Sequence, residues 1–341
     1  MAGYLRRSLR VLAVVFIVSL LYLGFWPAGI DPVAWAPQKA PAMTGIYAPN
    51  EKLARVTRIG EGVGIGPEGV AVDTQGRIYA GYLDGRIVRF SPDGKTHELF
   101  ARTNGRPLGM KFGAGENLYV ADAVRGLLEL TPDGRLIVLS SSAEGKAYRF
   151  TNDLDIARDG SIYFSDSSTR FGARDAIADI FEHRGTGRLL RYDPKTKRAR
   201  VLLRGLQYAD GVALAPDQSY VLVVETASYR VRVYCLTGPS KCKSDNFIDN
   251  LPSLPDGISS NGRNTFWLAM FTTRNPVADN LAPRPYLCKM IWRLPKFLHP
   301  GPKRYAFVLG LGLGTDGRIT HNLQDPKGQF APVTTVVEAR G

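Results

Sequence analysis

The feature that most constrains the fold is a repeat of short apolar strands separated by turns rich in Gly, Asp or Pro. The first copy covers residues 66–94, with turns at Gly76 and at Asp84-Gly85. Further copies begin at residues 107, 151, 209 and 255, and the first two copies both end in Pro-Asp-Gly. Four strands in about forty residues is the length of one blade of a β-propeller.

The strands of these repeats are rich in Val, Ile, Leu and Tyr, and no convincing amphipathic helix interrupts them. Asp and Gly tolerate the left-handed backbone of tight turns, so the pattern predicts antiparallel meanders. Meanders of four strands bury their faces against one another when they are arranged radially, which favours an all-β propeller. A β-sandwich is the alternative, but the grouping of turns in fours disfavours it.

Length and charge set further bounds. The chain of 341 residues is 44% hydrophobic, enough for one large all-β domain plus a tail. The formal net charge is +13, but the basic residues are spread through turns and strand edges, without the stacking aromatics that single-stranded nucleic acid needs. We therefore expect no nucleic-acid partner and a solvated basic surface that can rest against anionic lipid.

The N-terminus differs in kind from the repeats, because three arginines precede an uncharged stretch that is long enough to cross a bilayer. The charge pattern predicts a cytoplasmic basic tail (1–10), a transmembrane signal anchor (11–30), a Pro- and Ala-rich linker (31–50) and an extracytoplasmic propeller (51–341), which would be periplasmic, luminal or extracellular. A cleaved signal peptide is the alternative, since Ala34-Trp35-Ala36 is a small-x-small site, although Pro37 follows it.

The chain has three cysteines, too few for a disulfide scaffold. Cys235 and Cys242 flank a predicted hairpin turn and could form a disulfide outside the cytoplasm, which would leave Cys288 unpaired. Three unpaired thiols are equally compatible with the sequence, because spacing alone does not fix the distance between two Cα atoms.

Polar residues recur at the start of the first strand of successive repeats. In a propeller this strand lines the central channel, so the residues at its start converge although they are far apart in sequence. Four of the five positions carry oxygen donors, and the full set is Glu68, Leu108, Asn152, Asp210 and Asp256. Each donor taken alone has an ordinary explanation as a turn former, a loop cap or a solvated rim residue.

The shared position of these donors indicates a cation site instead. Grouped carboxylates raise one another's pKa unless a cation neutralises them. Oxygen donors without Cys or His suit Ca²⁺ better than zinc. The sequence therefore predicts a Ca²⁺ site at the mouth of the channel.

Four blade openings carry a resemblance to a known family: Gly-Pro-Glu-Gly-Val-Ala-Val-Asp (66–73), Phe-Thr-Asn-Asp-Leu-Asp-Ile (150–156), Tyr-Ala-Asp-Gly-Val-Ala-Leu (208–214) and Leu-Pro-Asp-Gly-Ile (254–258). They resemble the strictosidine synthase-like branch of the six-bladed propellers, a superfamily that includes gluconolactonases, regucalcins and paraoxonases. The resemblance covers residues 51–341, and the N-terminal anchor is similar to that of membrane-anchored members. These motifs are specific for the superfamily and much less so for a substrate.

The resemblance implies one catalytic Ca²⁺, held by Glu68, Asn152, Asp210 and Asp256. It also implies a hydrolase whose small-molecule substrate is a lactone or an aryl ester. The ion would polarise the carbonyl, and Asp256, Glu68 or a nearby water would supply the base or nucleophile. The family usually has Asn where this chain has Asp210, and the extra carboxylate should bind the cation more firmly and make it a weaker Lewis acid.

Three aromatic residues, Tyr208, Phe271 and Trp267, are candidates for an apolar substrate pocket near the channel, although such residues more often belong to the core. Two other functions compete with hydrolysis. Condensation of an amine with an aldehyde is disfavoured, because residues 328–332 contain no acid and Glu338 comes too late in the motif. A non-catalytic extracytoplasmic propeller that binds a ligand or partner is the alternative from another class.

The resemblance further implies six blades, of which the last is incomplete in this chain. Residues 333–341 are predicted to form the innermost strand of the sixth blade, and residues 53–59 could supply its outermost strand. Two strands that the family has would be absent, because the sequence is truncated or because the blade is incomplete. We therefore expect an open ring that is poorly stable or is completed by a partner.

Overall fold

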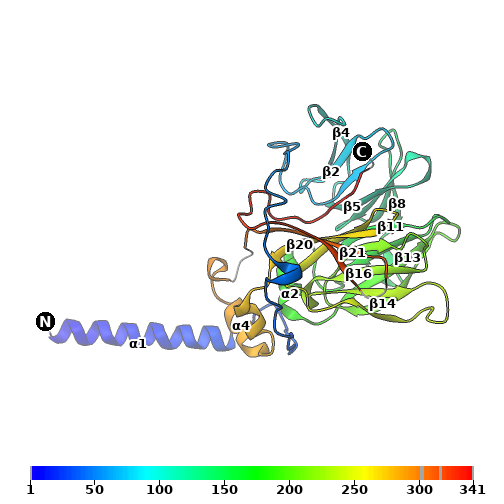
Figure 1. Ribbon diagram of the computed structural model, residues 1–341. Helices are drawn as coiled ribbons and strands as arrows, with labels where there is room; N and C mark the ends of the chain where they lie inside the picture. The colour runs from blue at the N-terminus through cyan, green and yellow to red at the C-terminus, as the bar shows by residue number, and fades with distance from the viewer. Residues whose placement is uncertain (1, 300–302, 315–316, 340–341) are drawn as a thin grey trace.

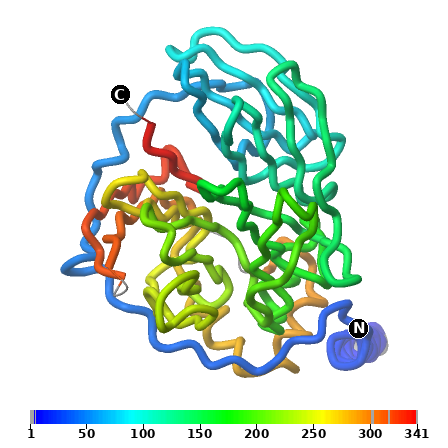
Figure 2. The backbone as a smooth tube through the Cα atoms, turned by 90° about the vertical axis from the view of Figure 1, so that its right-hand side faces the viewer, coloured from blue at the N-terminus to red at the C-terminus, as the bar shows by residue number. Residues whose placement is uncertain are grey.

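The computed structural model describes residues 2–299, 303–314 and 317–339. A single long helix projects from an all-β body in which successive four-stranded meanders are arranged around an axis (Figures 1 and 2). The described residues contain five such sheets, each with its strands in chain order. The prediction of an all-β propeller is therefore confirmed.

Each blade consists of four antiparallel strands. Their bounds are β1 (Val70–Val72), β2 (Ile78–Gly81), β3 (Arg86–Phe90) and β4 (His97–Arg102) in blade 1; β5 (Pro107–Phe112), β6 (Leu118–Asp122), β7 (Gly126–Leu130) and β8 (Leu136–Ser140) in blade 2; β11 (Thr151–Ile156), β12 (Ile162–Asp166), β13 (Gly187–Asp193) and β14 (Arg198–Leu206) in blade 3; β15 (Ala209–Leu214), β16 (Tyr220–Glu225), β17 (Arg230–Cys235) and β18 (Ser244–Ile248) in blade 4; β19 (Ser253–Ser260), β20 (Thr265–Thr273), β21 (Ala306–Gly312) and β22 (Ile319–Asp325) in blade 5. A small hairpin of β9 (Ser142–Ala143) and β10 (Lys146–Ala147) joins blades 2 and 3.

The tight turns form for the reason that the sequence suggests. In the turn between β1 and β2, Asp73 Oδ1 accepts hydrogen bonds from the backbone N–H groups of Gln75 and Arg77. In the turn after β3, the Asp93 carboxylate accepts from the Ser91 hydroxyl and from the Lys95 backbone. A short acidic side chain thus satisfies the backbone donors that a tight turn leaves without a strand partner.

Hydrophobic cores lie between neighbouring blades. One core joins blades 1 and 2, and further cores join blades 2 and 3, blades 3 and 4, and blades 4 and 5. Figure 2 shows the C-terminal segment between blade 5 and blade 1, where a further blade would stand. Within the described residues, neither 53–59 nor 333–338 is assigned as a strand, so a sixth sheet is not observed there.

Within the described ranges, four α-helices accompany the blades, namely α1 (Ala2–Phe25), α2 (Ala176–Glu182), α3 (Pro276–Leu281) and α4 (Pro285–Trp292). Short 3-10 helices lie at Gly45–Tyr47, Ala114–Glu116, Ala173–Asp175, Thr226–Ser228 and Lys296–Leu298. The expectation that no helix interrupts the strands is wrong, because α2 lies between β12 and β13, and α3 and α4 lie between β20 and β21. These helices are short, six to eight residues each, so the sequence offers little periodicity by which to recognise them.

The helix α1 contains an apolar stretch, Arg6–Phe25, that is long enough to cross a membrane and is not buried against the body. The chain after α1 runs along the outside of the blades (Figure 2). It contacts blade 5 through a backbone hydrogen bond from Leu53 to Gln324 and an ion pair between Glu51 and Lys327. The cysteines Cys235, Cys242 and Cys288 are all free thiols in this structure.

Candidate functional site

The innermost strand of every blade begins at the same end of the propeller axis, and we call this end the pocket face. The connections from the second to the third strand of each blade also lie on this face, and they include α2, α3 and α4. The turns from the first to the second and from the third to the fourth strand form the opposite face. A cavity of about 670 Å³ opens on the pocket face and reaches toward the axis.

A β-bulge interrupts the innermost strand in blades 2 to 5, at the residue that was predicted to face the channel. The register with the second strand shifts between Thr151 and Leu154, between Ala209 and Val212, and after Pro255. Blade 2 has the same shift after Pro107. A bulge redirects the side chain at that position, so one local distortion repeated around the ring aims these residues at the axis.

Close packing of the innermost strands explains the glycines that follow all three acids. A Cβ on Gly69, next to Glu68, would lie 1.6 Å from the Leu108 carbonyl oxygen of the neighbouring blade. A Cβ on Gly257, next to Asp256, would lie 2.6 Å from the Thr334 carbonyl oxygen. The acid faces the channel because the residue after it must be small enough to admit the adjacent backbone.

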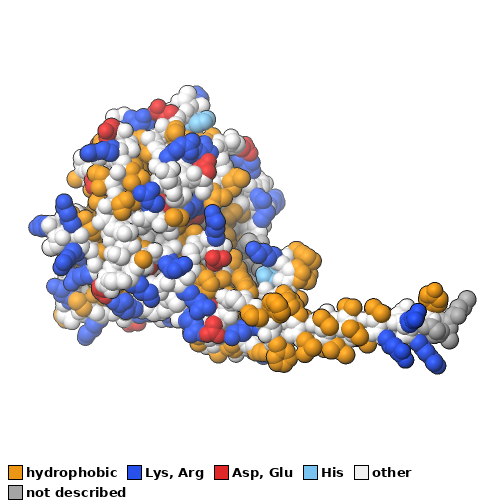
Figure 3. All heavy atoms as spheres, turned by 180° about the vertical axis from the view of Figure 1, so that it is seen from behind, with side chains coloured by type: hydrophobic (Ala, Val, Ile, Leu, Met, Phe, Trp, Pro, Cys, Tyr) orange, Lys and Arg blue, Asp and Glu red, His pale blue; other side chains and the backbone are white. Residues whose placement is uncertain are grey.

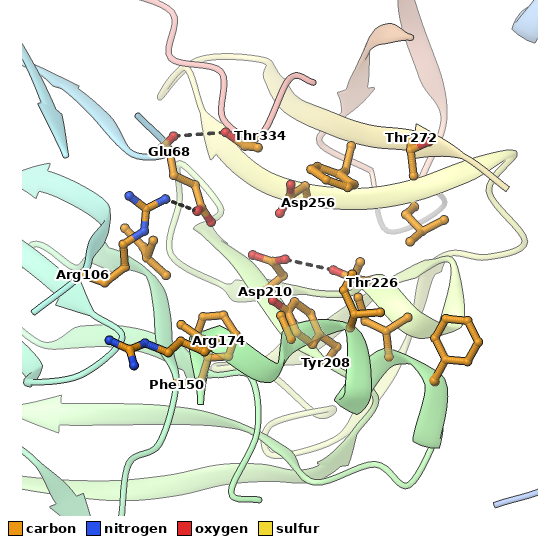
Figure 4. A pocket seen from close by; sticks show the side chains of 18 of the residues that line it. Glu68, Arg106, Phe150, Arg174, Tyr208, Asp210, Thr226, Asp256, Thr272 and Thr334 are labelled. Carbon is orange, nitrogen blue, oxygen red and sulfur yellow. Dashed lines mark hydrogen bonds and ion pairs between the residues drawn. The ribbon is translucent and has the colours of Figure 1, made fainter. Parts of the chain in front are cut away.

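Three of the predicted ligands line the cavity and point toward one another from blades 1, 4 and 5 (Figure 4). The Glu68 carboxylate accepts a hydrogen bond from Arg106 at 3.1 Å, and Asp210 accepts one from the Thr226 hydroxyl at 3.0 Å. Asp256 lies above Asp210 in this view and is 8% exposed. The structure thus brings together three carboxyl groups that are separated by more than forty residues in sequence.

Burial raises the pKa of all three acids, and repulsion by neighbouring carboxylates adds to the shift for Glu68 and Asp256. Burial and the charge of Asp210 raise the pKa of Glu68 to about 7, although Arg106 opposes the shift. Burial raises the pKa of Asp210 to about 6. The pKa of Asp256 is raised well above its ordinary value by burial and then by the charges of Asp210 and Glu68. Glu68 and Asp210 therefore exchange protons close to neutral pH.

Asn152, the fourth predicted ligand, is buried and is not among the residues that line the cavity. Its Nδ2 donates to the Ser167 hydroxyl, which in turn donates to the Ala209 carbonyl oxygen at 2.7 Å. This chain of hydrogen bonds fixes the amide and turns its carbonyl oxygen away from Ser167. The next residue, Asp153, is half-buried, and desolvation raises its pKa to about 8.

Two of the three predicted aromatic residues, Tyr208 and Phe271, line the cavity. Trp267 does not line it, and its Nε1 donates to the Glu338 carboxylate at 2.6 Å while its ring lies against His321. Glu338 also pairs with Arg263 and is likewise absent from the cavity lining. Their places along β20 explain the difference, because Trp267 lies near the opposite-face start of the strand and Phe271 lies near its pocket-face end.

Sequence reasoning missed several residues of the site, above all Arg106, which contacts Glu68 and the Gly66 carbonyl oxygen. Thr226 and Thr334 were also missed, although both line the cavity. Thr226 directly follows the apolar strand that ends at Glu225. Its place at the start of a pocket-face connection could therefore have been predicted from the sequence. Arg106 offers no such signal, because a single arginine before a proline is ordinary at the entry to a strand.

A second set of acids, at the ends of the second strands, has a structural role. Asp122 Oδ1 accepts hydrogen bonds from three backbone N–H groups, and Asp166 Oδ1 accepts from Phe150 and its neighbour. Glu225 accepts from the Gln207 backbone. Each acid thus ties the chain that enters an innermost strand to the end of the second strand, which positions the site residues that follow.

The donor chemistry of the three cavity acids fits a hard cation, since all donors are oxygens and burial, the main cause of their raised pKa values, leaves the charged carboxylates poorly solvated. Their geometry fits less well. Among the residues that the structure describes, no group of three or more His, Cys, Asp or Glu is arranged to hold a metal ion. Arg106 supplies part of the positive charge that a cation would otherwise provide to Glu68.

Comparison with known proteins places the chain in a family. Residues 152–239 match the family described as strictosidine synthase, and residues 45–90 match the one described as strictosidine synthase-like, N-terminal. The adipocyte plasma membrane-associated protein of Rattus norvegicus is 37% identical over 338 residues, which cover 91% of this chain and 87% of that protein. The chain belongs to the strictosidine synthase-like family. The human adipocyte plasma membrane-associated protein is 35% identical, with 96% of this chain and 83% of that protein covered.

The family also has plant members, since the Arabidopsis thaliana protein Strictosidine synthase-like 13 is 35% identical over 77% of this chain and 73% of its own length. Among solved structures, a gluconolactonase of Xanthomonas campestris has a TM-score of 0.56 at 19% identity, with 76% of each chain covered. A calcium-binding regucalcin of Agrobacterium tumefaciens has a TM-score of 0.52 at 14% identity, with 76% and 74% covered. At these identities the two structures support the shared fold.

Proposed function

We propose that this strictosidine synthase-like protein is a Ca²⁺-dependent hydrolase of lactones or aryl esters that acts in the cavity of the pocket face. The observation that carries the proposal is the convergence of Glu68, Asp210 and Asp256 from three blades at the base of one cavity. A gluconolactonase and a calcium-binding regucalcin have the same fold, which is consistent with this function.

In this proposal Glu68, Asn152, Asp210 and Asp256 hold the ion. When bound, Ca²⁺ would supply Lewis-acid polarisation of the substrate carbonyl and stabilise negative charge on its oxygen. Asp256, which lines the cavity, serves as the general base that removes a proton from the attacking water. Glu68 is the second catalytic candidate, and a pKa of about 7 lets it take up and release a proton near neutral pH.

The remaining walls of the cavity would bind the rest of the substrate. Phe150 and Tyr208 pack edge to face with ring centroids 5.5 Å apart, and Phe271 faces them from blade 5. Arg106 donates toward Glu68 from the adjacent blade and so positions that carboxylate. This combination of an apolar wall with convergent polar groups at one end is typical of a small-molecule site.

We also propose that residues 333–338 take the place of the innermost strand of a sixth blade. The Gly257 N–H donates to the Thr334 carbonyl oxygen, and the Ser259 hydroxyl donates to the Val336 carbonyl oxygen. On the other side, the Thr334 hydroxyl lies 3.4 Å from the Glu68 carbonyl oxygen. The segment thereby bridges blade 5 to blade 1 and contributes Thr334 to the cavity wall.

The anchor completes the proposal. We infer a single-pass membrane protein with its N-terminus in the cytoplasm and its propeller outside, because the arginines before the apolar stretch favour the cytoplasmic side. The adipocyte relatives are named as plasma membrane-associated proteins, which agrees with attachment to a membrane.

The test uses the full-length protein in lipid nanodiscs with aryl acetates and lactones, with and without a chelator. We expect activity to disappear with the chelator and to return with Ca²⁺. Asp256→Ala should lower kcat/KM by on the order of a hundredfold or more and should abolish stabilisation by Ca²⁺. Asp217→Ala, which changes an exposed acid on the opposite face, is the matched control and should leave activity unchanged. Full activity in Asp256→Ala would reject the site.

A non-catalytic, ligand-binding propeller is the second candidate. It is favoured by the ion pair of Arg106 with Glu68 and by the lack, among described residues, of three acids arranged around a common ion position. Protein that Ca²⁺ or a ligand stabilises, but that turns over no ester or lactone, would support this function and exclude hydrolysis.

A further inference from the structure

The rim of the pocket face carries exposed apolar side chains at four of the five connections between second and third strands. Leu83, Val124, Ile177 and Val277 are 57%, 67%, 50% and 56% exposed. The first three also line the cavity. Apolar side chains therefore lead from the outer rim into the cavity, whose lining also includes Arg106, Arg174 and Lys303.

The opposite face has no comparable feature. None of the large hydrophobic residues that are exposed lies in an opposite-face turn, within the ranges that the structure describes. Those turns consist mainly of Asp, Gly, Pro, Lys and Ser. Exposed apolar residues such as Leu99 and Val138 also lie on outermost strands, where single ones are ordinary. Among the connections between strands of one blade, however, they lie only on the pocket face within the described ranges, at the mouth of the cavity, which indicates a surface that meets an apolar environment.

The insertion between β20 and β21 extends this apolar surface beyond the rim. Phe297 is 83% exposed, and Leu298, Tyr286 and Leu287 are 54%, 55% and 40% exposed. Basic residues alternate with them, at Arg284, Lys289, Arg293 and Lys296. Apolar and aromatic side chains beside lysines and arginines are the chemistry of a segment that lies at a lipid headgroup boundary.

The anchor helix leaves the molecule from this same face (Figure 1). The end of α1 contacts α4 directly, because the Tyr286 hydroxyl donates to the Gly24 carbonyl oxygen and Arg293 Nε donates to the Trp26 carbonyl oxygen. Seen from behind, the hydrophobic side chains of α1 continue into those on the adjoining part of the body (Figure 3). The face that carries the apolar rim is thus the one that the anchor turns toward the bilayer.

The segment after α1 is fixed to the pocket face rather than loosely tethered. Asp31 pairs with Lys289 at 2.8 Å and with Arg184, and its backbone N–H donates to the buried Glu182 carboxylate. Farther along, the Trp35 ring lies against His183, with ring centroids 4.6 Å apart. The charges of Lys289 and Arg184 lower the pKa of Asp31, so this clamp stays ionised at neutral pH.

We propose that the pocket face docks onto the lipid surface and that the cavity takes up a membrane-dissolved, amphiphilic ester or lactone directly from the bilayer. The choice of substrate rests on the proposed hydrolytic function, whereas docking does not. The span Arg6–Phe25 fixes the face at the membrane, the insertion contributes Phe297 and Leu298 to the interface, and the apolar rim opens the cavity to the acyl region. The acids at the base of the cavity then meet the ester group.

The docking is tested with an environment-sensitive fluorophore on single cysteines of the full-length protein in phosphatidylcholine vesicles. Leu83→Cys and Phe297→Cys are labelled in a background in which Cys235 and Cys242 are replaced by Ser. We expect a blue-shifted emission and loss of fluorescence when the vesicles contain lipids with a quencher in the acyl chain. Leu83 is the decisive site, because it belongs to blade 1 and is not part of the insertion that α1 contacts.

The native Cys242 provides the matched control, since it is exposed and lies in the turn between β17 and β18 on the opposite face. Labelled Cys242, with Cys235 replaced by Ser, should keep a water-like emission and should not be quenched. Equal behaviour of the labels at Leu83 and Cys242 would overturn the docking proposal, because it would mean that the propeller merely hangs from its anchor.

The substrate is tested with two aryl esters that share one leaving group, a water-soluble acetate and a long-chain ester dissolved in the vesicles. Phe297→Ser combined with Leu298→Ser should slow hydrolysis of the long-chain ester by roughly tenfold. This is the loss expected when a phenylalanine and a leucine that are each partly buried in lipid are both removed. Hydrolysis of the acetate should not change, because neither residue lines the cavity.

The outcomes separate the two proposals. If the labels report contact with lipid but neither ester is hydrolysed, the membrane-facing surface is supported and the hydrolytic function is rejected. Hydrolysis of both esters with equal sensitivity to the double substitution, or with none, rejects uptake from the bilayer and leaves the hydrolase intact.

Discussion

The two faces of the propeller are built from the same repeat but differ in chemistry. On the opposite face the turn acids Asp93 and Asp217 are exposed, and hydrogen bonds hold their pKa low: the Ser91 hydroxyl lowers the pKa of Asp93, and the Ser219 backbone lowers that of Asp217. On the pocket face, burial raises the pKa of Glu68 and Asp210 instead. The same residue type thus closes a turn at one end of the axis and forms a cluster of carboxyl groups with raised pKa values at the other.

The difference follows from what surrounds each end of a strand. Opposite-face turns are short and solvated, so an acid there gains backbone and hydroxyl donors at little desolvation cost. At the pocket face the innermost strands converge, and α2, α3 and the C-terminal segment enclose the space above them. Function is therefore expected to be sensitive at one face and tolerant at the other, and three further experiments examine that contrast.

The largest effect on stability is expected at the buried ion pair of Arg188 with Asp166, at the pocket-face end of β13. Both side chains are almost fully buried, and Asp166 also holds the Phe150 backbone. Arg188→Met should lower the free energy of unfolding by about 3–5 kcal/mol, because it leaves a buried carboxylate without its partner. Urea unfolding of the full-length protein measures this loss.

The matched control is Arg191→Met on the same strand. Arg191 pairs at 3.3 Å with Asp159, which is largely exposed in an opposite-face turn. We expect a loss of no more than about 1 kcal/mol. Equal losses for the two variants would mean that the two faces do not differ in how strongly they depend on their ion pairs.

A smaller effect is expected from a single methyl group at Gly257. Its Cβ would meet the Thr334 carbonyl oxygen, so Gly257→Ala should displace residues 333–338 and cost about 1–3 kcal/mol. Hydrogen exchange of the backbone amides in 333–338 should then become faster. Gly262→Ala, in an opposite-face turn with open space around the Cβ, should cost about 1 kcal/mol for its positive φ and leave that exchange unchanged.

The smallest effect concerns pH. Glu68 and Asp210 have pKa values raised to about 7 and about 6, from ordinary values of 4.5 and 3.8. Between about pH 4 and pH 7 the folded protein therefore binds more protons than the unfolded chain, so these groups make stability fall as pH rises. With a chelator present, we expect Tm to decrease across this range, and Ca²⁺ to oppose the decrease because it favours the ionised carboxylates.

Glu68→Gln should reduce this dependence on pH, since the amide does not titrate. Asp93→Asn provides the contrast, because the pKa of Asp93 is lowered and its contribution is lost only as pH falls through the acid range. A Tm profile of Glu68→Gln that follows the unmodified protein from pH 4 to pH 7 would contradict the assignment.

Much of the site could be predicted because the repeat fixes register. Once the strands are counted in fours, Glu68, Asp210 and Asp256 occupy one structural position, and the structure places all three in one cavity. The same argument did not predict that Asn152 is absent from the cavity lining, because the hydrogen bond to Ser167 that fixes its amide depends on a neighbouring strand. Arg106 was not predictable, since its contact with Glu68 spans two blades and leaves no pattern in the sequence.

The sequence by itself determined the blade meanders, their order and the apolar N-terminal helix, because alternating strands, turn residues and an uncharged stretch are local patterns. Only the tertiary structure decided how the bulged strands pack, which acids share a cavity, and that Asp31 and the end of α1 attach to the face where that cavity opens. These features depend on contacts between residues up to some 260 positions apart. Such contacts are set by close packing and burial in three dimensions, for which a linear pattern carries no signal.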